Sequence, residues 1–250
     1  MWKVFECMAK IGMPLCIRGE MVHHNGKEVD IFYREKVFIE QVLDPLRCRL
    51  PKLKIVIVNI STEVAARYVL DAYNRNHACG KPCTLAGTIT PHHLVLNRNR
   101  LFGYGMRSRL YCLPIPNTEE DQQALRKAAT SGLPCFFLGS DPAPYPTDFD
   151  QGLCGCDGVF NAPTALATYA EVFEKEGELD NLEPFASLHG PDFLGLEPDP
   201  RSIALVKKPW CQPAKIEVTA LTPSFSRPCY IDRSVPVFRG GEQLEWAIAA

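Results

Sequence analysis

An aspartate at the end of an apolar segment is the residue whose type and position best suit catalysis. Asp141 follows the apolar residues 133–138 and the pair Gly139-Ser140, and Pro142 fixes the turn after it. A carboxylate at the end of a strand can ligate a metal or act as a general base. The same residue can also start a loop by accepting hydrogen bonds from nearby backbone amides. From these residues alone, the loop-starting role is the simpler interpretation.

Histidine and cysteine pairs offer a second kind of chemistry. His92 and His93 are adjacent within residues 87–96, which we expect to be a strand, so their side chains should point to opposite faces and not share a metal ion. Cys154 and Cys156 could supply two thiolates to zinc, but no second pair lies at the spacing of a zinc finger. The 11 cysteines are an odd number, which favours reduced, buried thiols in a cytosolic protein.

The elements that must position these residues alternate between strand and helix. Apolar and β-branched runs predict buried strands of the parallel type, and apolar residues at helical spacing between them predict covering helices. We expect strands at residues 14–17, 54–60, 87–96, 109–115 and 133–138, and helices at 31–47, 63–74, 119–131 and 163–176. The proline-rich segment 198–236 is expected to form a loop-rich cover. This alternation predicts an α/β fold built on a parallel sheet.

Composition excludes several classes of protein. The 250 residues carry 27 Lys and Arg against 29 Asp and Glu, whereas a non-specific nucleic-acid binder needs a basic surface. A hydrophobic content of 46% excludes a disordered chain. No apolar run approaches the roughly 18 residues that span a bilayer, and Lys3, Glu6 and Lys10 interrupt the first segment. We therefore expect a single cytoplasmic domain over residues 1–250, with no nucleic-acid or membrane partner.

Long collinear segments carry a family resemblance. They are IGMPLCIRGE, KIVIVNIST, TITPHHLVLNRN, YCLPI, CFFLGSDPAP, CGCDGVFNAPTALATYAEVFE and FASLHGPDFLGL, and the resemblance as a whole extends from about residue 11 to 246. In this order they resemble the bacterial-type, single-function dihydroorotase, a zinc amidohydrolase of pyrimidine biosynthesis. The resemblance implies an incomplete (β/α)8 TIM barrel of the metal-dependent hydrolase type, of which this chain supplies strands four to eight.

The resemblance also implies a site. In the family, two zinc ions are bridged by a carboxylated lysine and a hydroxide that attacks the ring amide of dihydroorotate, and the reverse reaction closes carbamoyl aspartate to the ring. Asp141 maps onto the strand-end aspartate that is both metal ligand and general base. Leu113 and Asp157 map onto positions that contact substrate through the backbone. Tyr145 stands where the family has a substrate-contacting histidine.

The chain departs from the family at its metal ligands. Arg18 and Asn59 stand where the family has ligand histidines, and the His-x-His motif and bridging lysine of the family fall before Met1. Arginine is permanently charged and has no lone pair to donate, and asparagine offers only a weak neutral oxygen. We therefore expect a catalytically deficient protein that binds zinc weakly or not at all. We also expect Arg18 to pair with Asp141 in place of a cation.

Two alternatives stay open from the sequence. The first is an active dihydroorotase whose missing strands come from another chain, in a homo- or hetero-oligomer, because five parallel strands cannot close the barrel and would leave two exposed edges. The second is a non-catalytic binding or regulatory homologue that takes small acidic ligands, drawn by Arg18, Arg107 and Arg109. The implied small-molecule ligand is dihydroorotate or carbamoyl aspartate.

Overall fold

A four-stranded parallel sheet forms the centre of the molecule. The computed structural model describes residues 1–103, 105–145, 158–222 and 229–249, with the backbone alone at 219–222 and 229–233. The strands are β1 (Leu15–Arg18), β4 (Ile55–Val58), β5 (Leu85–Ile89) and β6 (Phe136–Leu138). They pair in the order β1-β4-β5-β6, and the register places Arg18 beside Val58 and Ile89 beside Leu138. The carboxyl ends of all four strands therefore lie at the same end of the sheet.

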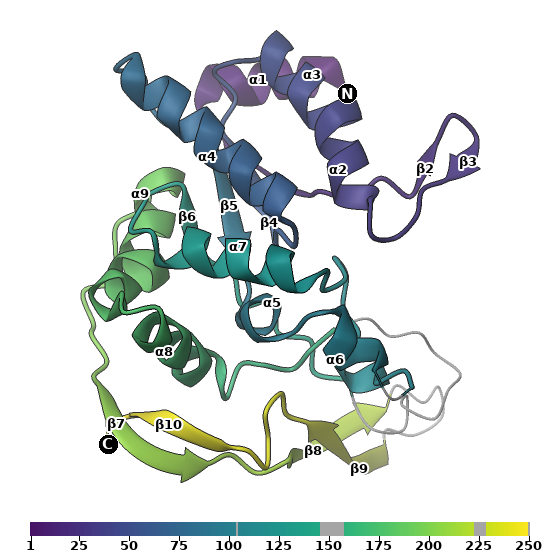
Figure 1. Cartoon of the computed structure of the whole chain (residues 1–250), viewed down its shortest axis with the longest axis vertical. Helices are drawn as coiled ribbons and strands as arrows, with labels where there is room; N and C mark the ends of the chain where they lie inside the picture. The colour runs from purple at the N-terminus through teal and green to yellow at the C-terminus, as the bar shows by residue number, and fades with distance from the viewer. Residues whose placement is uncertain (104, 146–157, 223–228, 250) are drawn as a thin grey trace.

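Helices lie between the strands along the chain (Figure 1), most of them on one face of the sheet and the last of them on the other. In chain order, the α-helices are α1 (Trp2–Ile11), α2 (Arg34–Phe38), α3 (Asp44–Arg49), α4 (Glu63–Ala78), α5 (Pro91–Val95), α6 (Arg98–Phe102), α7 (Glu119–Thr130), α8 (Ala165–Lys175) and α9 (His189–Leu194). The shorter helical turns are η1 (Ile39–Leu43), η2 (Ser108–Leu110), η4 (Leu179–Asn181) and η5 (Pro184–Leu188). Thr62 caps α4 by accepting from the Ala65 amide, and Thr118 forms a capping box with Asp121 at α7.

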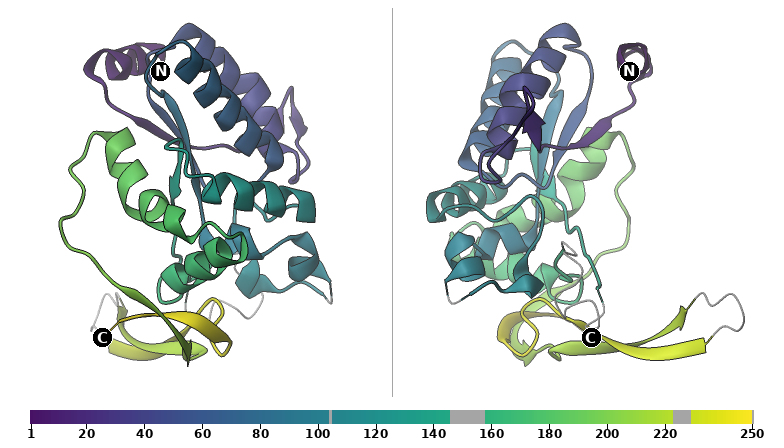
Figure 2. Two further views of the ribbon diagram at one scale, coloured as in Figure 1. Left: turned by 60° about the vertical axis from the view of Figure 1, so that its left-hand side comes forward. Right: turned by 90° about the vertical axis from the view of Figure 1, so that its right-hand side faces the viewer.

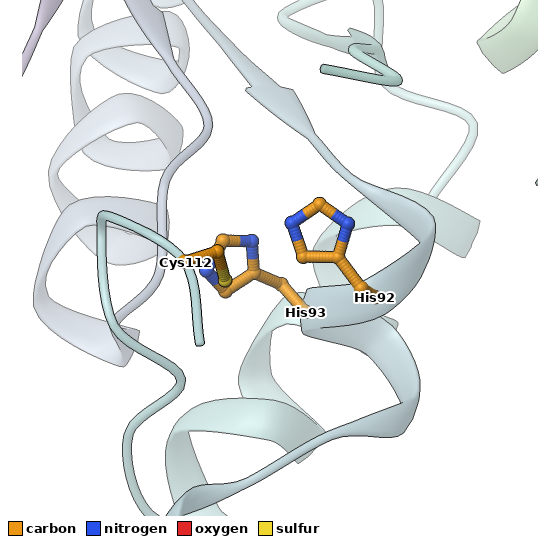
Figure 3. A group of neighbouring side chains, drawn as sticks. All are labelled: His92, His93 and Cys112. Atoms are coloured by element: carbon orange, nitrogen blue, oxygen red, sulfur yellow. The ribbon is translucent and has the colours of Figure 1, made fainter. Parts of the chain in front are cut away.

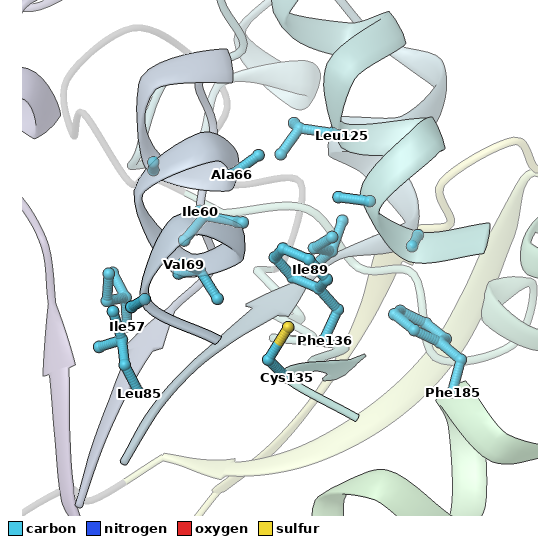
Figure 4. Close-up of a cluster of buried hydrophobic side chains, with 14 of the residues drawn as sticks. Ile57, Ile60, Ala66, Val69, Leu85, Ile89, Leu125, Cys135, Phe136 and Phe185 are labelled. Carbon is cyan, nitrogen blue, oxygen red and sulfur yellow. The ribbon is translucent and has the colours of Figure 1, made fainter. Parts of the chain in front are cut away.

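The main core lies between the sheet and these helices (Figure 4). Ile57 and Ile89 from the sheet pack with Val69 of α4, Leu125 of α7 and Phe185 of η5, and all five are buried. A second, smaller cluster covers the other face, where its members are Val56, Ala86, Phe137 and Phe193. Neighbouring residues of a strand point to opposite faces, so the apolar run of β4 is explained by burial on both sides.

The expected strand at 109–115 is wrong. Its first residues form the 3₁₀ turn η2, and the rest is an irregular segment with a cis peptide bond between Leu113 and Pro114. Pro114 and Pro116 have no N–H to give to a sheet, which favours a non-strand conformation. The described part of the sheet therefore has four strands, where the sequence predicted five.

Two local features differ from what residue types alone suggest. Proline often ends a helix, but the helical residues continue from α2 through the π-helical turn η1 into α3, whose first turn contains Pro45. The charged, glycine-containing segment 22–29, whose composition is typical of a loop, forms a hairpin of β2 (His23–His24) with β3 (Lys27–Glu28). Asn25 and Gly26 at its turn have positive φ, as an Asn-Gly hairpin turn requires.

The C-terminal cover also contains strands. Its strands are β7 (Leu205–Cys211), β8 (Lys215–Thr222), β9 (Cys229–Pro236) and β10 (Gln243–Ile248), which pair antiparallel as β7 with β10 and β8 with β9. The expectation of loops over 198–236 was therefore wrong. This ribbon lies across one end of the molecule, next to α8 (Figure 2). The prolines of the segment predicted loops, but proline is tolerated in two-stranded, solvent-exposed strand pairs.

The sheet has two edges in the described part of the chain, where β1 pairs only with β4 and β6 only with β5. At the β6 edge, His189 Nδ1 lies 3.2 Å from the Phe136 carbonyl oxygen and donates to it. This carbonyl points away from β5, since the neighbouring Cys135 oxygen accepts the bond from Gly87 of that strand. The chain thus blunts one edge with its own side chain. Within the described residues, no helix is both long enough and apolar enough to cross a membrane.

Candidate functional site

Four polar residues meet at the carboxyl ends of the four parallel strands. Arg18 is the last residue of β1, Asn59 follows β4, Thr88 lies near the end of β5, and Asp141 follows β6 in the turn Gly139-Ser140-Asp141. Reactive groups of α/β barrels gather at this end of the sheet. The structure therefore brings Arg18, Asn59 and Asp141 together, as the sequence predicted.

The Asp141 carboxylate is contacted by both Asn59 and Arg18. Asn59 Nδ2 donates a hydrogen bond of 2.7 Å to Asp141 Oδ2, and Arg18 Nη2 lies 3.5 Å from the same oxygen. The Asn59 side chain is buried, whereas those of Arg18 and Asp141 are 45% and 44% exposed. The expected Arg18–Asp141 ion pair is confirmed. The ion pair is half exposed, so solvent weakens it. The buried Asn59 amide therefore contributes more to holding the carboxylate than the Arg18 guanidinium does.

Thr88 sets the orientation of the Asn59 amide. Its hydroxyl accepts a 2.8 Å hydrogen bond from the Asn59 backbone N–H and donates to Asn59 Oδ1 at 3.3 Å. With Oδ1 occupied in this way, the N–H side of the amide faces Asp141. Gly139 leaves the space for this arrangement, since a Cβ there would lie 2.6 Å from Thr88 Cβ. Thr88 and Gly139 were not predicted as site residues.

Two of these residues have an uncommon backbone conformation. Asn59 has φ = 60° and Asp141 has φ = 43°, and both side chains belong to the types that tolerate the left-handed region best. Such conformations are kept where surrounding contacts determine them, and they cluster at functional sites. The turns after β4 and β6 are thus specified by residue type as well as by the side-chain network.

These donor groups do not fit a two-zinc centre. Zinc needs neutral or anionic ligands with free lone pairs. Arg18 has none, and Asn59 presents its N–H to Asp141 and its oxygen to Thr88. Of the three residues at this point, only the Asp141 carboxylate could bind a cation, and its Oδ2 atom is already bound twice. One carboxylate cannot replace the several ligands that build zinc affinity.

The expectation that His92 and His93 lie on a strand is wrong. β5 ends at Ile89, Thr90 caps a new helix, and both histidines lie in α5. Thr-Pro before a helix is a recognised start signal, which the polar and apolar alternation of 87–96 concealed. Both rings are buried, 4.8 Å apart between centroids, and burial lowers the pKa of His93 to about 4 and that of His92 well below its usual value. Both are therefore neutral at physiological pH.

Together with Cys112, this pair has the composition of a metal site (Figure 3). One potential ligand atom from each of His92, His93 and Cys112 lies within 4.8 Å of the others. The ring nitrogens are nevertheless engaged: His93 Nδ1 is 2.6 Å from Thr90 Oγ1 and its Nε2 is 2.8 Å from the Pro114 oxygen. His92 Nδ1 is 3.0 Å from Asn161 Nδ2. The hydrogen bonds occupy the lone pairs that a metal would need.

No hydrogen bond or ion pair with Asp141 is seen for the residues that were predicted to bind substrate, as far as the structure describes them. Leu113 is half-buried and immediately precedes Pro114, whose carbonyl accepts from His93. Tyr145 is 41% exposed, four residues beyond Asp141. Asp157 lies outside the described residues. The substrate contacts that the resemblance implied for these three stay predictions.

A buried carboxyl group, missed from the sequence, fixes the start of α4 beside the site. Glu35 of α2 is buried and accepts from the Ser61 backbone N–H at 3.1 Å and from the Thr62 hydroxyl. Desolvation raises its pKa from 4.5 to about 7, although these hydrogen bonds act in the opposite direction. Ser61 and Thr62 follow Asn59 by two and three residues, so Glu35 supports the turn that carries this site residue.

Known proteins identify the origin of this arrangement. No protein-family model matches the chain. A curated dihydroorotase from Synechococcus sp. (strain CC9605) is 46% identical over 246 residues, which are 98% of this chain and 63% of that protein. The chain is a dihydroorotase homologue. It spans less than two thirds of the length of the curated relatives that it matches.

Solved structures agree with this assignment. A dihydroorotase from Saccharomyces cerevisiae, crystallised in complex with 5-fluoroorotic acid, superposes with a TM-score of 0.81 at 30% identity, covering 98% of this chain and 65% of that one. An L-hydantoinase from Arthrobacter aurescens shares the fold alone, at 14% identity and a TM-score of 0.71 over 99% of this chain and 57% of that one. The dihydroorotase homologue is thus an incomplete (β/α)8 barrel of the amidohydrolase type, and its parallel sheet is part of that barrel.

Proposed function

We propose that this dihydroorotase homologue acts in pyrimidine biosynthesis as a catalytically deficient member of its family, which binds zinc weakly or not at all. The observation that carries the proposal is the double contact on Asp141, by Asn59 Nδ2 at 2.7 Å and by Arg18 Nη2 at 3.5 Å. Arg18 offsets the charge of the carboxylate, and Asn59 occupies one of the oxygens with which it would otherwise bind a cation. The guanidinium also adds positive charge at the place where zinc would sit.

The chemistry of amide hydrolysis supports this proposal. When zinc is bound in hydrolases, it lowers the pKa of its water from about 15.7 to about 7 and so supplies hydroxide at neutral pH. A general base must have a free acceptor for the proton that it removes. Asp141 Oδ2 already accepts from Asn59, so only the second oxygen is open to that role. We therefore expect no turnover of dihydroorotate above background.

The ligand class that suits the site is a small anion related to dihydroorotate or carbamoyl aspartate. The positive charge of Arg18 at the strand ends and the basic residues Arg107 and Arg109 support recognition of a carboxylate. We place this protein in the cytoplasm, and the eight cysteines that the structure describes are all free, as a reducing compartment requires. Binding without turnover would make it a regulatory or pseudoenzyme homologue.

The second candidate function is an active dihydroorotase completed by another chain in a homo- or hetero-oligomer. The outer side of β1, which has no strand partner among the residues that the structure describes, favours it. A partner could supply further strands and ligands, but Arg18 and Asn59 would still occupy two ligand positions. This candidate therefore needs a metal site built from other residues.

The deciding experiment is the initial rate of dihydroorotate hydrolysis by the purified chain with added zinc, beside an Asp141→Ala variant. We expect both proteins to give the background rate. A rate above background in the natural chain that disappears in Asp141→Ala would overturn the proposal. Calorimetric titration with orotate then separates the remaining roles, because measurable binding that weakens in Arg18→Ala supports a carboxylate site.

A further inference from the structure

The buried histidine pair of α5 connects two turns of the candidate site. We propose that His92 and His93 are positioning residues: His92, through Asn161, fixes the turn that presents Asp141, and His93 fixes the turn that follows Leu113. The inference rests on the proposed function only in taking these two turns as parts of the binding site. In this inference, the cluster of His92, His93 and Cys112 holds two backbone turns in place and does not bind a metal.

The bonds of His93 allow a single protonation pattern. The Pro114 carbonyl can only accept, so Nε2 must carry the proton and donate across the 2.8 Å contact. The neutral ring then has its lone pair on Nδ1, which accepts from the Thr90 hydroxyl at 2.6 Å. That hydroxyl in turn accepts from the His93 backbone N–H at 3.2 Å. Every polar atom of the unit is thus satisfied, and the ring bridges the start of α5 to Pro114.

The bonds of His92 give the same tautomer by a different route. Asn161 Nδ2 can only donate, so His92 Nδ1 must accept across the 3.0 Å contact and the ring proton resides on Nε2. The same Asn161 amide nitrogen donates to the Ser140 carbonyl at 2.6 Å. Ser140 directly precedes Asp141, so the chain of contacts runs from the ring to the turn of the site.

Asn161 has an orientation that its surroundings fix. Rotating its amide would point Oδ1 at the Ser140 carbonyl, which places two acceptors against each other. Its backbone oxygen accepts from the Thr164 N–H at 2.9 Å, and the Thr164 hydroxyl donates to the Phe238 oxygen at 2.8 Å. In the described part of the chain, Asn161 Oδ1 has no hydrogen-bond partner although the residue is fully buried. A buried amide with one unsatisfied atom is kept where its other bonds are needed.

A metal would have to displace these bonds. Binding at Nδ1 of His93 would compete with the Thr90 hydroxyl, and binding at Nδ1 of His92 would compete with the Asn161 amide. Cys112 Sγ lies 3.7 Å from the Pro114 oxygen, the acceptor that His93 also uses. His93 and Cys112 thus contact the Pro114 carbonyl, and His92 contacts Asn161, which donates to the Ser140 carbonyl. This arrangement holds backbone segments in place.

The test combines a spectrum of the natural chain with local hydrogen exchange of variants. Long-range ¹H–¹⁵N spectra should show both rings as neutral Nε2–H tautomers, unchanged when zinc is added. His92→Phe should speed amide exchange in residues 139–143 by about tenfold and leave 110–115 unchanged, whereas His93→Phe should do the reverse. His92→Asn keeps an acceptor near Nδ1 and His93→Gln keeps a donor near Nε2, so both should restore protection.

The outcomes separate clearly. An Nδ1–H tautomer in either ring, a zinc-dependent shift, or equal loosening of both turns by either Phe variant would overturn the inference. His23→Gln, at an exposed histidine of β2, is the matched control and should change neither turn. If a Phe variant fails to fold, the natural spectrum and the Asn and Gln variants still decide. None of these measurements depends on catalytic turnover or on a bound ligand. The proposed function can therefore fail while this inference holds, and this inference can fail while the proposed function holds.

Discussion

The Asn59–Asp141 contact is the centre of a hydrogen-bond network at the carboxyl ends of the strands. The amide is buried, oriented by Thr88, and donates a hydrogen bond to the Asp141 side chain. Asn59→Ala removes this charge-assisted bond and places alanine at a positive φ, so we predict a loss of about 2–3 kcal/mol in the free energy of unfolding. Urea denaturation measures it.

Asn25→Ala is the matched control for the backbone part of that loss. Asn25 also has positive φ but lies in the exposed β2–β3 turn, so its replacement should cost only about 1 kcal/mol. Arg18→Ala should cost about 0.5 kcal/mol or less, and salt should screen that difference, because the pair is half exposed. Equal losses for Asn59→Ala and Asn25→Ala would show that the network contributes nothing.

At the residue scale, Asp141 was predicted from its place at the end of an apolar run, and the resemblance added Arg18 and Asn59 as its neighbours. Arg18, Asn59 and Asp141 were expected to meet, and they do. Thr88 and Asn161 were missed because each acts through a hydrogen bond to a residue 29 and 69 positions away in the chain. No local pattern reports such contacts, since threonine and asparagine are common in loops for other reasons.

At the scale of single elements, Glu35 makes the start of α4 sensitive to pH. Burial raises its pKa to about 7, so the folded chain holds this proton more tightly than the unfolded chain does. The stabilisation from that protonation is complete below about pH 4.5 and is lost as the pH rises to about 7. We predict that natural protein loses stability relative to Glu35→Gln across this window, by at most about 1.4 kcal/mol per pH unit.

The comparison with the variant is essential to this prediction. The buried histidines His92 and His93 change the stability in the opposite sense. Below about pH 6.5 the unfolded chain binds protons at these histidines that the folded chain does not bind, so stability falls as the pH falls. They are present in both proteins and cancel in the difference. Urea denaturation from pH 5 to pH 8 gives the curves, with Glu40→Gln, at an exposed site on the same helical stretch, as control. Parallel curves for natural protein and Glu35→Gln would refute the assignment.

Elements with explicit end signals were predicted well, and the others were not. The threonine caps placed the starts of α4 and α7 within a residue, and the strands β4 and β6 lie inside the expected apolar runs. The segment 87–96 failed because its apolar alternation continues from a strand into a helix. The local signal for the change was Thr90-Pro91, a cap residue followed by proline at the first helical position, and periodicity alone does not weigh such a signal.

At the scale of the whole molecule, the half-barrel leaves surface that a closed barrel would cover. The outer face of α1 exposes Val4 and Ile11 by 58% and 69%, and in the chain α1 precedes β1, whose outer side has no strand partner among the described residues. Exposed apolar patches and strand edges favour association. We predict that the molar mass rises with protein concentration in light scattering coupled to gel filtration.

The variant Val4→Lys with Ile11→Lys should shift that dependence to higher concentration. Val64→Lys is the matched control, since Val64 is exposed to 42% on α4, on the covered side of the sheet. A natural chain that stays monomeric at every concentration, or a control that acts as strongly as the α1 variant, would contradict this prediction. The sequence anticipated exposed edges but not the His189 contact that blunts β6, because the contact joins residues 53 apart.

Zinc stoichiometry tests the central claim most directly, since the claim is that Asn59 and Arg18 take the place of the cation at Asp141. Metal content after dialysis against micromolar zinc should be the same in the natural chain and in Asp141→Asn, whatever the free cysteines retain. Arg18→His with Asn59→His should raise it. One or two zinc ions per natural chain that disappear in Asp141→Asn would contradict the account and show that the strand-end site still holds metal.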